Sequence, residues 1–191
     1  MVPIKEALTF DDVTLAPKYS EILPSQVDTS IKITNNLQLK VPLLSSAMDT
    51  ITESKMAIAV AKAGGLGIIH RNLNIKEQIL EIKKVKKKEL LVGAAVGAGA
   101  NEFKRAEEIL KEKIDMIVVD TAHAHTKKVS EIIKFIKKKK NKKTALCAGN
   151  IATPEAAKFL LKLGVDVIKV GIGPGSICTT RLVAGIGVPQ L

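Results

Sequence analysis

Short apolar runs alternate with amphipathic stretches along most of the chain, at a nearly constant spacing. Apolar runs typical of buried strands begin at Pro42, Leu66, Leu91, Met116, Thr144 and Val167, one every 23 to 28 residues. The stretches between them have apolar residues at helical spacing, over residues 52–63, 75–86, 102–112, 127–139 and 153–163. This order predicts β-α units on a parallel sheet, in which the strands are covered on both faces.

The residues at the ends of the predicted helices agree with this periodicity. The last helical pattern starts with Thr153 as a candidate N-cap, and Pro154 follows it in the first turn, where its missing N–H would have no helical partner. Gly64 and Gly164 stand where two helical patterns end, and glycine suits a C-terminal cap because it adopts positive φ without strain.

Six near-equal β-α periods are typical of two folds, a doubly wound sheet and a (β/α)8 TIM barrel. A dinucleotide-binding Rossmann half has G-x-G-x-x-G directly after its first strand, whereas SSAMDT follows Leu44 here. The pattern therefore favours the barrel. A complete barrel takes about 250 residues, so the chain predicts an incomplete α/β barrel, with residues 41–191 as its first six β-α units. Residues 1–40 are expected to form an extended segment that packs on the outside or caps the bottom.

The charge and composition of the chain limit the classes of partner that it is expected to bind. Thirty Lys and Arg against nineteen Asp and Glu give a net charge of +11, which permits binding to polyanions. Much of the lysine lies in two runs, residues 83–88 and 137–143, at helix-to-strand connections remote from any barrel site. With four Phe, one Tyr and no Trp, the chain has few platforms for stacking bases. We expect no nucleic acid as the primary partner, no membrane partner, and a cytoplasmic protein without a disulfide framework.

Barrel sites lie at the C-terminal ends of the strands, where this chain concentrates glycine and polar residues. The last such end carries Gly171, Gly173 and Gly175, whose bare backbone suits an anion or a cation. Ser176 adds a hydroxyl suited to phosphate. Cys178 follows in a polar loop, where a nearby cation such as Arg181 would favour its nucleophilic thiolate.

Each of these features also has a plainer interpretation. A glycine-rich loop after a strand is commonly only a turn, and a lone cysteine is commonly an inert small apolar residue. Cys147, inside TALCAG, is expected in the core. Asp120 ends a run of four apolar residues and is expected to face a ligand. His123 and His125 would suit a catalytic metal, but only His70 remains as a third histidine, which disfavours a metallohydrolase.

Six segments together resemble the IMP dehydrogenase / GMP reductase family. In chain order they are LTFDDVTLAP (residues 8–17), SSAMDTITE (45–53), GGLGIIHRN (64–72), VVDTAHAH (118–125), AGNIATPEAA (148–157) and GIGPGSICTTRLVAGIGVPQ (171–190). Residues 183–188 resemble the dehydrogenase more than the reductase. The reductase, which would convert GMP to IMP with NADPH, is the alternative enzyme, and a non-catalytic barrel fragment is the alternative outside enzymes.

The resemblance implies a specific chemistry. Cys178 would attack C2 of IMP, hydride would pass to NAD, and the covalent thioimidate would be hydrolysed to XMP in guanine nucleotide synthesis, with Thr180 positioning the water. The implied substrate-binding residues are Ser46, Met48, Gly175 and Ser176. The implied cofactor-binding residues are Asp120, Thr121, Asn150 and Gly171. Backbone carbonyls of Gly173, Gly175 and Cys178 would ligate potassium.

Two departures from the family pattern are visible in the sequence. The CBS regulatory pair, expected near residues 86–90, is absent, because Lys86-Lys87-Lys88-Glu89 leads directly into LLVGAAVG. The chain also stops before the last two β-α units and the Arg-Tyr flap expected of the dehydrogenase, so the 191 residues alone are expected to be inactive. When complete, the protein is expected to be a homotetramer.

Overall fold

The computed structural model of the chain describes residues 6–191. The order of its elements is η1 (Phe10–Asp12), η2 (Pro24–Gln26), β1 (Ile31–Thr34), β2 (Leu37–Leu39), β3 (Leu44–Ser45), α1 (Ser54–Lys62), β4 (Leu66–Ile69), α2 (Ile75–Lys86), β5 (Val92–Val96), α3 (Glu102–Lys111), β6 (Met116–Asp120), α4 (Lys127–Lys139), β7 (Ala145–Ile151), α5 (Pro154–Leu163), β8 (Val167–Val170) and α6 (Thr180–Ala184).

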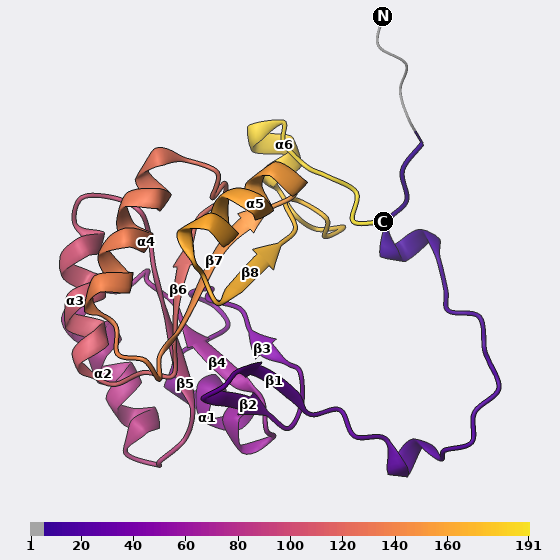
Figure 1. Ribbon diagram of the computed structural model, residues 1–191, viewed down its shortest axis with the longest axis horizontal. Coiled ribbons are helices and arrows are strands. Elements are labelled where there is room, and N and C mark those ends of the chain that lie inside the picture. Colours follow the sequence, from indigo (N-terminus) through magenta and orange to yellow (C-terminus); the bar gives the residue numbers. More distant parts are fainter. Residues whose placement is uncertain (1–5) are drawn as a thin grey trace, which may run out of the picture.

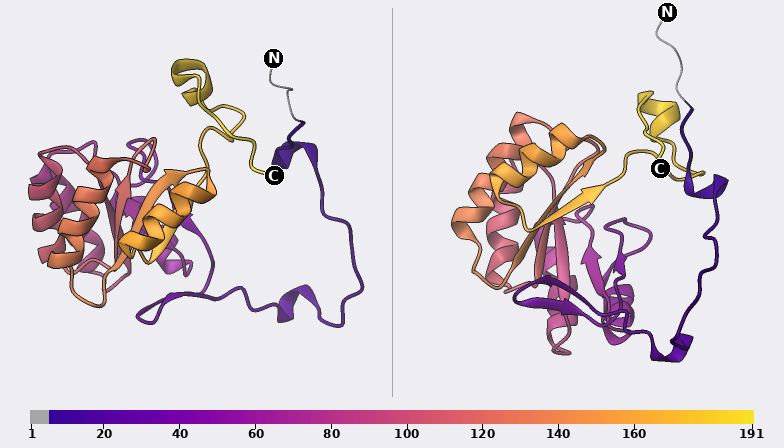
Figure 2. Two further views of the ribbon diagram at one scale, coloured as in Figure 1. Left: turned by 45° about the horizontal axis from the view of Figure 1, so that its top comes forward. Right: turned by 45° about the vertical axis from the view of Figure 1, so that its right-hand side comes forward.

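Six strands form one parallel sheet in the order β3-β4-β5-β6-β7-β8, which is their order in the sequence. The sheet curls, and the helices between the strands cover its outer face (Figures 1 and 2). A doubly wound sheet would reverse its strand order at a switch point, and this sheet does not. The prediction of an incomplete (β/α)8 barrel is therefore confirmed.

The predicted helices are confirmed, and α5 has the caps expected at both ends. Helix α1 ends with Ala63 as its C-cap, and Gly64 follows with φ of +95°. Helices α2 and α4 have the predicted bounds, and α5 starts one residue later because Thr153 is its N-cap. The Thr153 hydroxyl accepts the Ala156 N–H at 3.2 Å. Gly164 closes α5 with φ of +74°, in the left-handed region that glycine adopts at helix ends.

Two apolar clusters hold the half-barrel together. The larger lies between the sheet and its helices and includes Ile82, Ile109 and Ile132, all fully buried. The smaller lies on the inner face of the sheet, where Met116 and Cys147 are buried. Strands β4, β5, β6 and β7 are buried along most of their length because both of their faces are covered. The strands at the two edges of the sheet, β3 and β8, were expected to be covered likewise but are only partly buried.

A β-hairpin that the sequence analysis did not predict covers the bottom of the inner cluster. Strands β1 and β2 pair antiparallel, and Leu37 and Leu39 from β2 are buried in that cluster. The hairpin is anchored where Asn36 Nδ2 donates to the Lys142 carbonyl oxygen at 3.2 Å. The Lys40 N–H also donates to the Gly64 oxygen at 2.9 Å. The N-terminal ends of the strands are thus closed by chain that precedes the barrel.

Residues 6–30, which precede the hairpin, run away from the barrel as an extended, exposed segment (Figure 1). Large apolar side chains in it face solvent, with Leu15 99% and Tyr19 89% exposed. The far end of this segment meets the other end of the chain, where the Leu191 N–H donates to the Leu8 oxygen at 3.2 Å. Residues 1–5 of the segment predicted over residues 1–40 lie outside the described residues.

The two lysine runs lie at the ends of α2 and α4, on the bottom face opposite the C-terminal ends of the strands. Several of these lysines pair with acids of neighbouring elements, as Lys86 does with Asp115 at 3.2 Å and Lys140 with Asp166 at 3.3 Å. Among residues 6–191, no helix has the length and apolar character needed to cross a membrane.

Candidate active site

Two clefts open at the C-terminal ends of the strands and share Asp120 as a wall. The first, here called the cysteine cleft, has a volume of about 390 Å³. The predicted site residues that line it are Asp120, Thr121, Asn150, Gly171, Gly173, Cys178 and Thr180. The second, here called the methionine cleft, also measures about 390 Å³ and is lined by Met48, Asp49, His70, Arg71 and Asn72 besides Asp120.

Asp120 forms an ion pair that the sequence analysis did not anticipate. Lys169 Nζ donates to Asp120 Oδ1 at 2.8 Å, joining the ends of β6 and β8 across β7. The approach depends on Gly149 in the strand between them, because a Cβ there would lie 2.5 Å from the Cβ and the carbonyl oxygen of Lys169. Lys169 is the one charged residue in the apolar run VIKVGIG, but the sequence does not indicate its partner.

Backbone and amide groups fix the floor of the cysteine cleft. Thr121 is hydrogen-bonded to both sides of the Gly149–Asn150 peptide. Its N–H and hydroxyl donate to the Gly149 oxygen at 2.8 and 3.0 Å, and its own carbonyl oxygen accepts the Asn150 N–H at 2.7 Å. Asn150 Nδ2 donates to the Gly171 oxygen at 2.8 Å, which fastens β7 to the glycine-rich loop. These contacts preorganise the polar groups that face the cleft.

Cys178 lies on the glycine-rich loop with its sulfur 3.3 Å from Thr180 Oγ1. Hydrogen bonds from the hydroxyl and the backbone N–H of Thr180 lower the pKa of the Cys178 thiol from its ordinary value, and the charge of Arg181 makes a smaller contribution. The effect of the cation expected from the sequence is therefore present, but it is smaller than that of Thr180. Thr180 is the main cause because it contacts the sulfur directly.

The Arg181 side chain is engaged elsewhere in the same loop. Its Nη2 donates to the Gly175 carbonyl oxygen at 3.1 Å, and that oxygen also accepts the Cys178 N–H at 3.1 Å. Gly171 and Gly173 have φ of +123° and +65°, conformations that favour glycine, and they let the chain turn back under the cysteine.

The second cysteine contrasts with the first. Cys147 on β7 is only 5% exposed, in the core as predicted. Burial raises its pKa to about 12, so it stays a thiol. The two cysteines therefore differ in both access and ionisation.

The remaining predicted site residues are less closely grouped. Met48 lines the methionine cleft and is half exposed. Ser46 is exposed and borders a cavity of about 220 Å³ inside the half-barrel, which Lys169 also lines. Gly175 and Ser176 are exposed on the loop and do not line the cysteine cleft.

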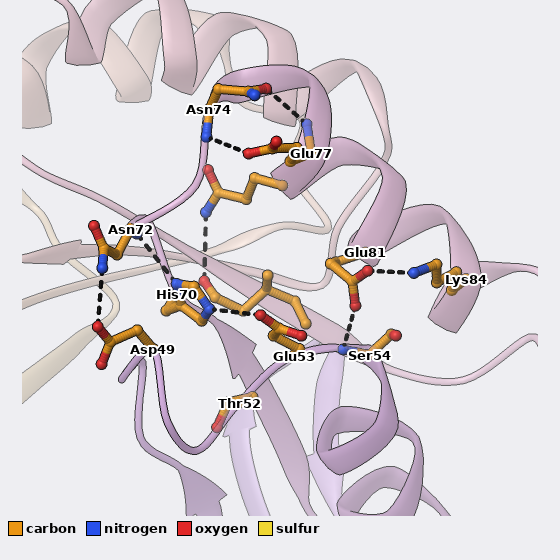
Figure 3. A network of polar contacts seen from close by, with 12 residues as sticks. Asp49, Thr52, Glu53, Ser54, His70, Asn72, Asn74, Glu77, Glu81 and Lys84 are labelled. Carbon is orange, nitrogen blue, oxygen red and sulfur yellow. Dashed lines mark hydrogen bonds and ion pairs between the residues drawn. The ribbon is translucent and has the colours of Figure 1, made fainter.

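A polar network beside the methionine cleft was missed by the sequence analysis (Figure 3). His70 is 2% exposed at the end of β4 and contacts Glu53 and Asn72. Asn72 Nδ2 in turn donates to Asp49 Oδ2 at 2.9 Å. Among residues 6–191, no three His, Cys, Asp or Glu side chains converge as metal ligands would. His70 belongs to the network above, and the centroid of the His125 ring lies 4.8 Å from that of the Phe159 ring.

The half-barrel and its loop define a class of protein, a (β/α)8-barrel protein with an ionisable cysteine at the C-terminal ends of its strands. The particular family follows from comparison with known proteins. The sequence model of the IMP dehydrogenase / GMP reductase domain matches residues 7–191, and the chain belongs to this family.

Three similar proteins are all named inosine-5′-monophosphate dehydrogenase. The chain is 44% identical to the protein of Borreliella burgdorferi, over 98% of the chain and 58% of that protein. It is 42% identical to the protein of Cryptosporidium parvum, over 98% and 57%. It is 33% identical to the protein of Aquifex aeolicus, over 98% and 64%. The chain thus spans about three fifths of the length of these relatives.

Proposed function

We propose that this chain forms part of an enzyme that oxidises IMP to XMP with NAD, in guanine nucleotide synthesis. One observation carries the proposal: Cys178, with a lowered pKa, lines the same cleft as Asp120, Thr121 and Asn150. A thiolate is the form of cysteine that adds to an electron-poor carbon, and the adjoining polar groups suit the hydroxyl groups and amide of a nucleotide. The names of the relatives give the substrate and the oxidation.

The chemistry proceeds in two steps at Cys178. The thiolate adds to C2 of the purine of IMP, and the hydrogen on C2 leaves as hydride, which gives a covalent thioimidate. Water then attacks C2, the carbon–sulfur bond breaks, and XMP leaves with oxygen at C2 while the thiolate is restored. One proton is released overall. The Thr180 hydroxyl, 3.3 Å from the sulfur, favours the thiolate, and we assign to it the orientation of the water.

NAD supplies the hydride acceptor when bound. The residues that line the cysteine cleft fit this group, because the Asp120 carboxylate can accept hydrogen bonds from ribose hydroxyls and the Asn150 side-chain oxygen can accept one from the nicotinamide. Lys169 holds the Asp120 carboxylate in place. Asp120, Thr121, Asn150 and Gly171 are the residues we assign to the cofactor.

Ser46, Met48, Gly175 and Ser176 are assigned to IMP. Met48 gives the purine an apolar surface in the methionine cleft. Gly175 and Ser176 are exposed on the loop. Their backbone N–H groups and the Ser176 hydroxyl are suited to bind phosphate. Asp120 belongs to both clefts, so substrate and cofactor would meet near it.

The resemblance also implies potassium at the carbonyl oxygens of Gly173, Gly175 and Cys178. Carbonyl oxygens are suitable ligands for such an ion. However, the Gly175 oxygen here accepts N–H groups from Cys178 and Arg181, and the guanidinium stands beside the oxygen that the ion would need. The loop in this conformation does not fit the ion, and no step above uses it.

The test is turnover in the full-length enzyme that contains this chain. With IMP and NAD, the unaltered enzyme should form NADH and XMP, and rapid quenching should trap a purine adduct on the peptide with Cys178. Cys178→Ser should abolish turnover while retaining IMP binding, because the phosphate contacts do not need the sulfur. Cys147→Ser is the matched control and should retain turnover but lose stability through a buried hydroxyl. Full activity in Cys178→Ser would overturn the proposal.

Two further assays separate the alternatives. Turnover of GMP with NADPH, with release of ammonia, would identify the reductase instead. Absence of turnover with either substrate pair would favour a non-catalytic role in folding or assembly. A homotetramer, measured by light scattering of the full-length enzyme, and a cytoplasmic location remain predictions.

A further inference from the structure

His70 links the two loops that border the methionine cleft. It directly follows β4 and is 2% exposed. Its backbone N–H donates to the Thr52 carbonyl oxygen at 3.3 Å, which ties the start of the β4–α2 loop to the β3–α1 loop. The β3–α1 loop bears Ser46 and Met48, the residues assigned above to IMP.

The contacts of the His70 imidazole fix its tautomer. The Asn72 N–H donates to Nδ1 at 3.2 Å, so Nδ1 carries no hydrogen in the neutral ring. Nε2–H therefore donates to Glu53 Oε1, 3.3 Å away. Asn72 then extends the connection, because its side chain donates to Asp49, the residue after Met48. Figure 3 shows His70 between Glu53 on one side and Asn72 on the other.

Thr52 links His70 to Ser46 and Met48, the residues assigned to IMP. Its side chain is completely buried, and its hydroxyl donates to the Ser46 carbonyl oxygen at 2.6 Å and lies 3.0 Å from the Ser45 hydroxyl. The Thr52 N–H donates to the Met48 carbonyl oxygen at 3.0 Å. The backbone of Ser46 and Met48 is therefore held by Thr52, and Thr52 and its neighbour Glu53 are held by His70.

We propose that His70 is a positioning residue for the purine nucleotide. Nε2 holds the β3–α1 loop directly at Glu53, and Nδ1 holds the Asn72 backbone, whose side chain holds the same loop at Asp49. These contacts keep Ser46 and Met48 in the conformation that receives IMP. This inference rests on the proposed function. His70 does not exchange protons with the substrate, because both nitrogens are engaged by Glu53 and Asn72 and the ring is buried.

Kinetics of the full-length enzyme test the role in binding. His70→Ala should raise KM for IMP about tenfold or more and change kcat less than about threefold, because the loop contacts IMP equally in the ground and transition states. His70→Asn should raise KM less than His70→Ala does, since its side-chain oxygen can accept the Asn72 N–H in place of Nδ1 while the contact with Glu53 is lost. Asn72→Ala should raise KM too, and adding it to His70→Ala should have little further effect, because both changes break the connection that runs from His70 through Asn72 to Asp49.

Thr144→Val is the matched control for lost stability. Thr144 is 1% exposed at the bottom of the barrel, where its hydroxyl donates to the Ile114 oxygen at 2.8 Å. This variant also loses a buried hydrogen bond but should leave KM for IMP unchanged. An unchanged KM in His70→Ala, or an equal rise in Thr144→Val, would overturn the inference.

A measurement without ligand separates this inference from the proposed function. Hydrogen exchange of the amides in residues 46–53 and 70–74 should be about tenfold faster or more in His70→Ala and unchanged in Thr144→Val, because the loop opens locally. If these amides keep their protection in His70→Ala, the positioning role is wrong even where IMP is turned over. If the amides lose their protection in His70→Ala but the unaltered enzyme turns over no IMP, His70 does position the loop. In that case the proposed function is wrong, and so is the assignment of the loop to IMP.

Discussion

The ammonium group of Lys169, at the end of β8, lies 2.8 Å from a carboxylate oxygen of Asp120, at the end of β6. The two residues are 49 positions apart in the chain. Both line the cysteine cleft, and both side chains are partly exposed there. The pair places a positive charge beside the carboxylate that we assign to the cofactor ribose.

Replacing Lys169 with methionine should weaken cofactor binding. The Asp120 carboxylate would be free to turn, and an uncompensated negative charge would face an anionic dinucleotide. We expect KM for NAD to rise about tenfold, or ~1.4 kcal/mol. Lys86→Met is the matched control, because Lys86 pairs with Asp115 at 3.2 Å at the bottom of the barrel. Steady-state kinetics that give the same KM for both variants would contradict this role of Lys169.

Alkylation should distinguish the two cysteines. Thr180 lowers the pKa of Cys178, whereas burial raises the pKa of Cys147 to about 12. At pH 8 a thiol with that pKa is ionised in only about one molecule in ten thousand, and it is the thiolate that reacts. Brief iodoacetamide treatment should therefore label Cys178 first, as read by peptide mass spectrometry.

IMP should protect Cys178 in the full-length enzyme, since the proposed substrate covers the sulfur. Thr180→Val should slow the labelling of Cys178 and leave Cys147 unchanged, because it removes the hydroxyl that favours the thiolate. Preferential labelling of Cys147, or labelling of Cys178 that saturating IMP does not alter, would return the loop to a plain glycine-rich turn.

The buried thiol should make stability depend on alkaline pH. The unfolded chain loses the Cys147 proton near pH ~8.5, whereas the folded protein keeps it up to about pH 12. Between these values the folded state binds more protons, so the free energy of unfolding falls as pH rises, by about 1.4 kcal/mol per pH unit. The stabilising contribution is complete below pH ~8.5 and is lost as pH rises toward 12.

Urea unfolding at pH 9 and pH 10.5 measures this effect, with Cys147→Ala as the reference that lacks the thiol. Titration of the lysines is common to both proteins and cancels in the comparison. The unaltered protein should lose about 2 kcal/mol more than the variant over this range. An equal loss in both would show that Cys147 ionises as readily in the folded protein as in the unfolded chain.

Gly67 should tolerate no side chain. A Cβ at this position of β4 would lie 2.4 Å from Ala57 Cα, in the backbone of α1, so the helix would have to move off the sheet. Gly67→Ala should destabilise the protein by ~2–3 kcal/mol. Gly99→Ala is the control, because no atom lies within 4 Å of the added Cβ. Thermal unfolding that shows equal melting temperatures for the two variants would contradict this account of the packing.

The barrel elements could be predicted from the sequence because they depend on local periodicity. Helices α2 and α4 coincide with their predicted ranges, and Thr153 and Gly164 mark the ends of α5. The hairpin of β1 and β2 could not be predicted in the same way. Its strands are short, and Leu37 and Leu39 are buried only because the inner cluster lies above them.

The candidate site also has residues that the sequence predicts and contacts that it does not. Sequence motifs located Cys178, Asp120 and Asn150, because barrel sites follow the ends of strands and these residues stand there. The Lys169 contact with Asp120 depends on Gly149 and on the curl of three strands, which leave no pattern along the chain.

The sequence by itself determined the order of the β-α units, the family and the residues at the strand ends, since each is encoded in adjacent positions. Only the tertiary structure decided which of those residues touch. It gave Thr180 rather than Arg181 the main effect on the Cys178 pKa, and it buried His70 between two loops. The physical reason is that a hydrogen bond or ion pair depends on distances of about 3 Å, and residues distant in sequence reach such distances only when the strands are packed side by side.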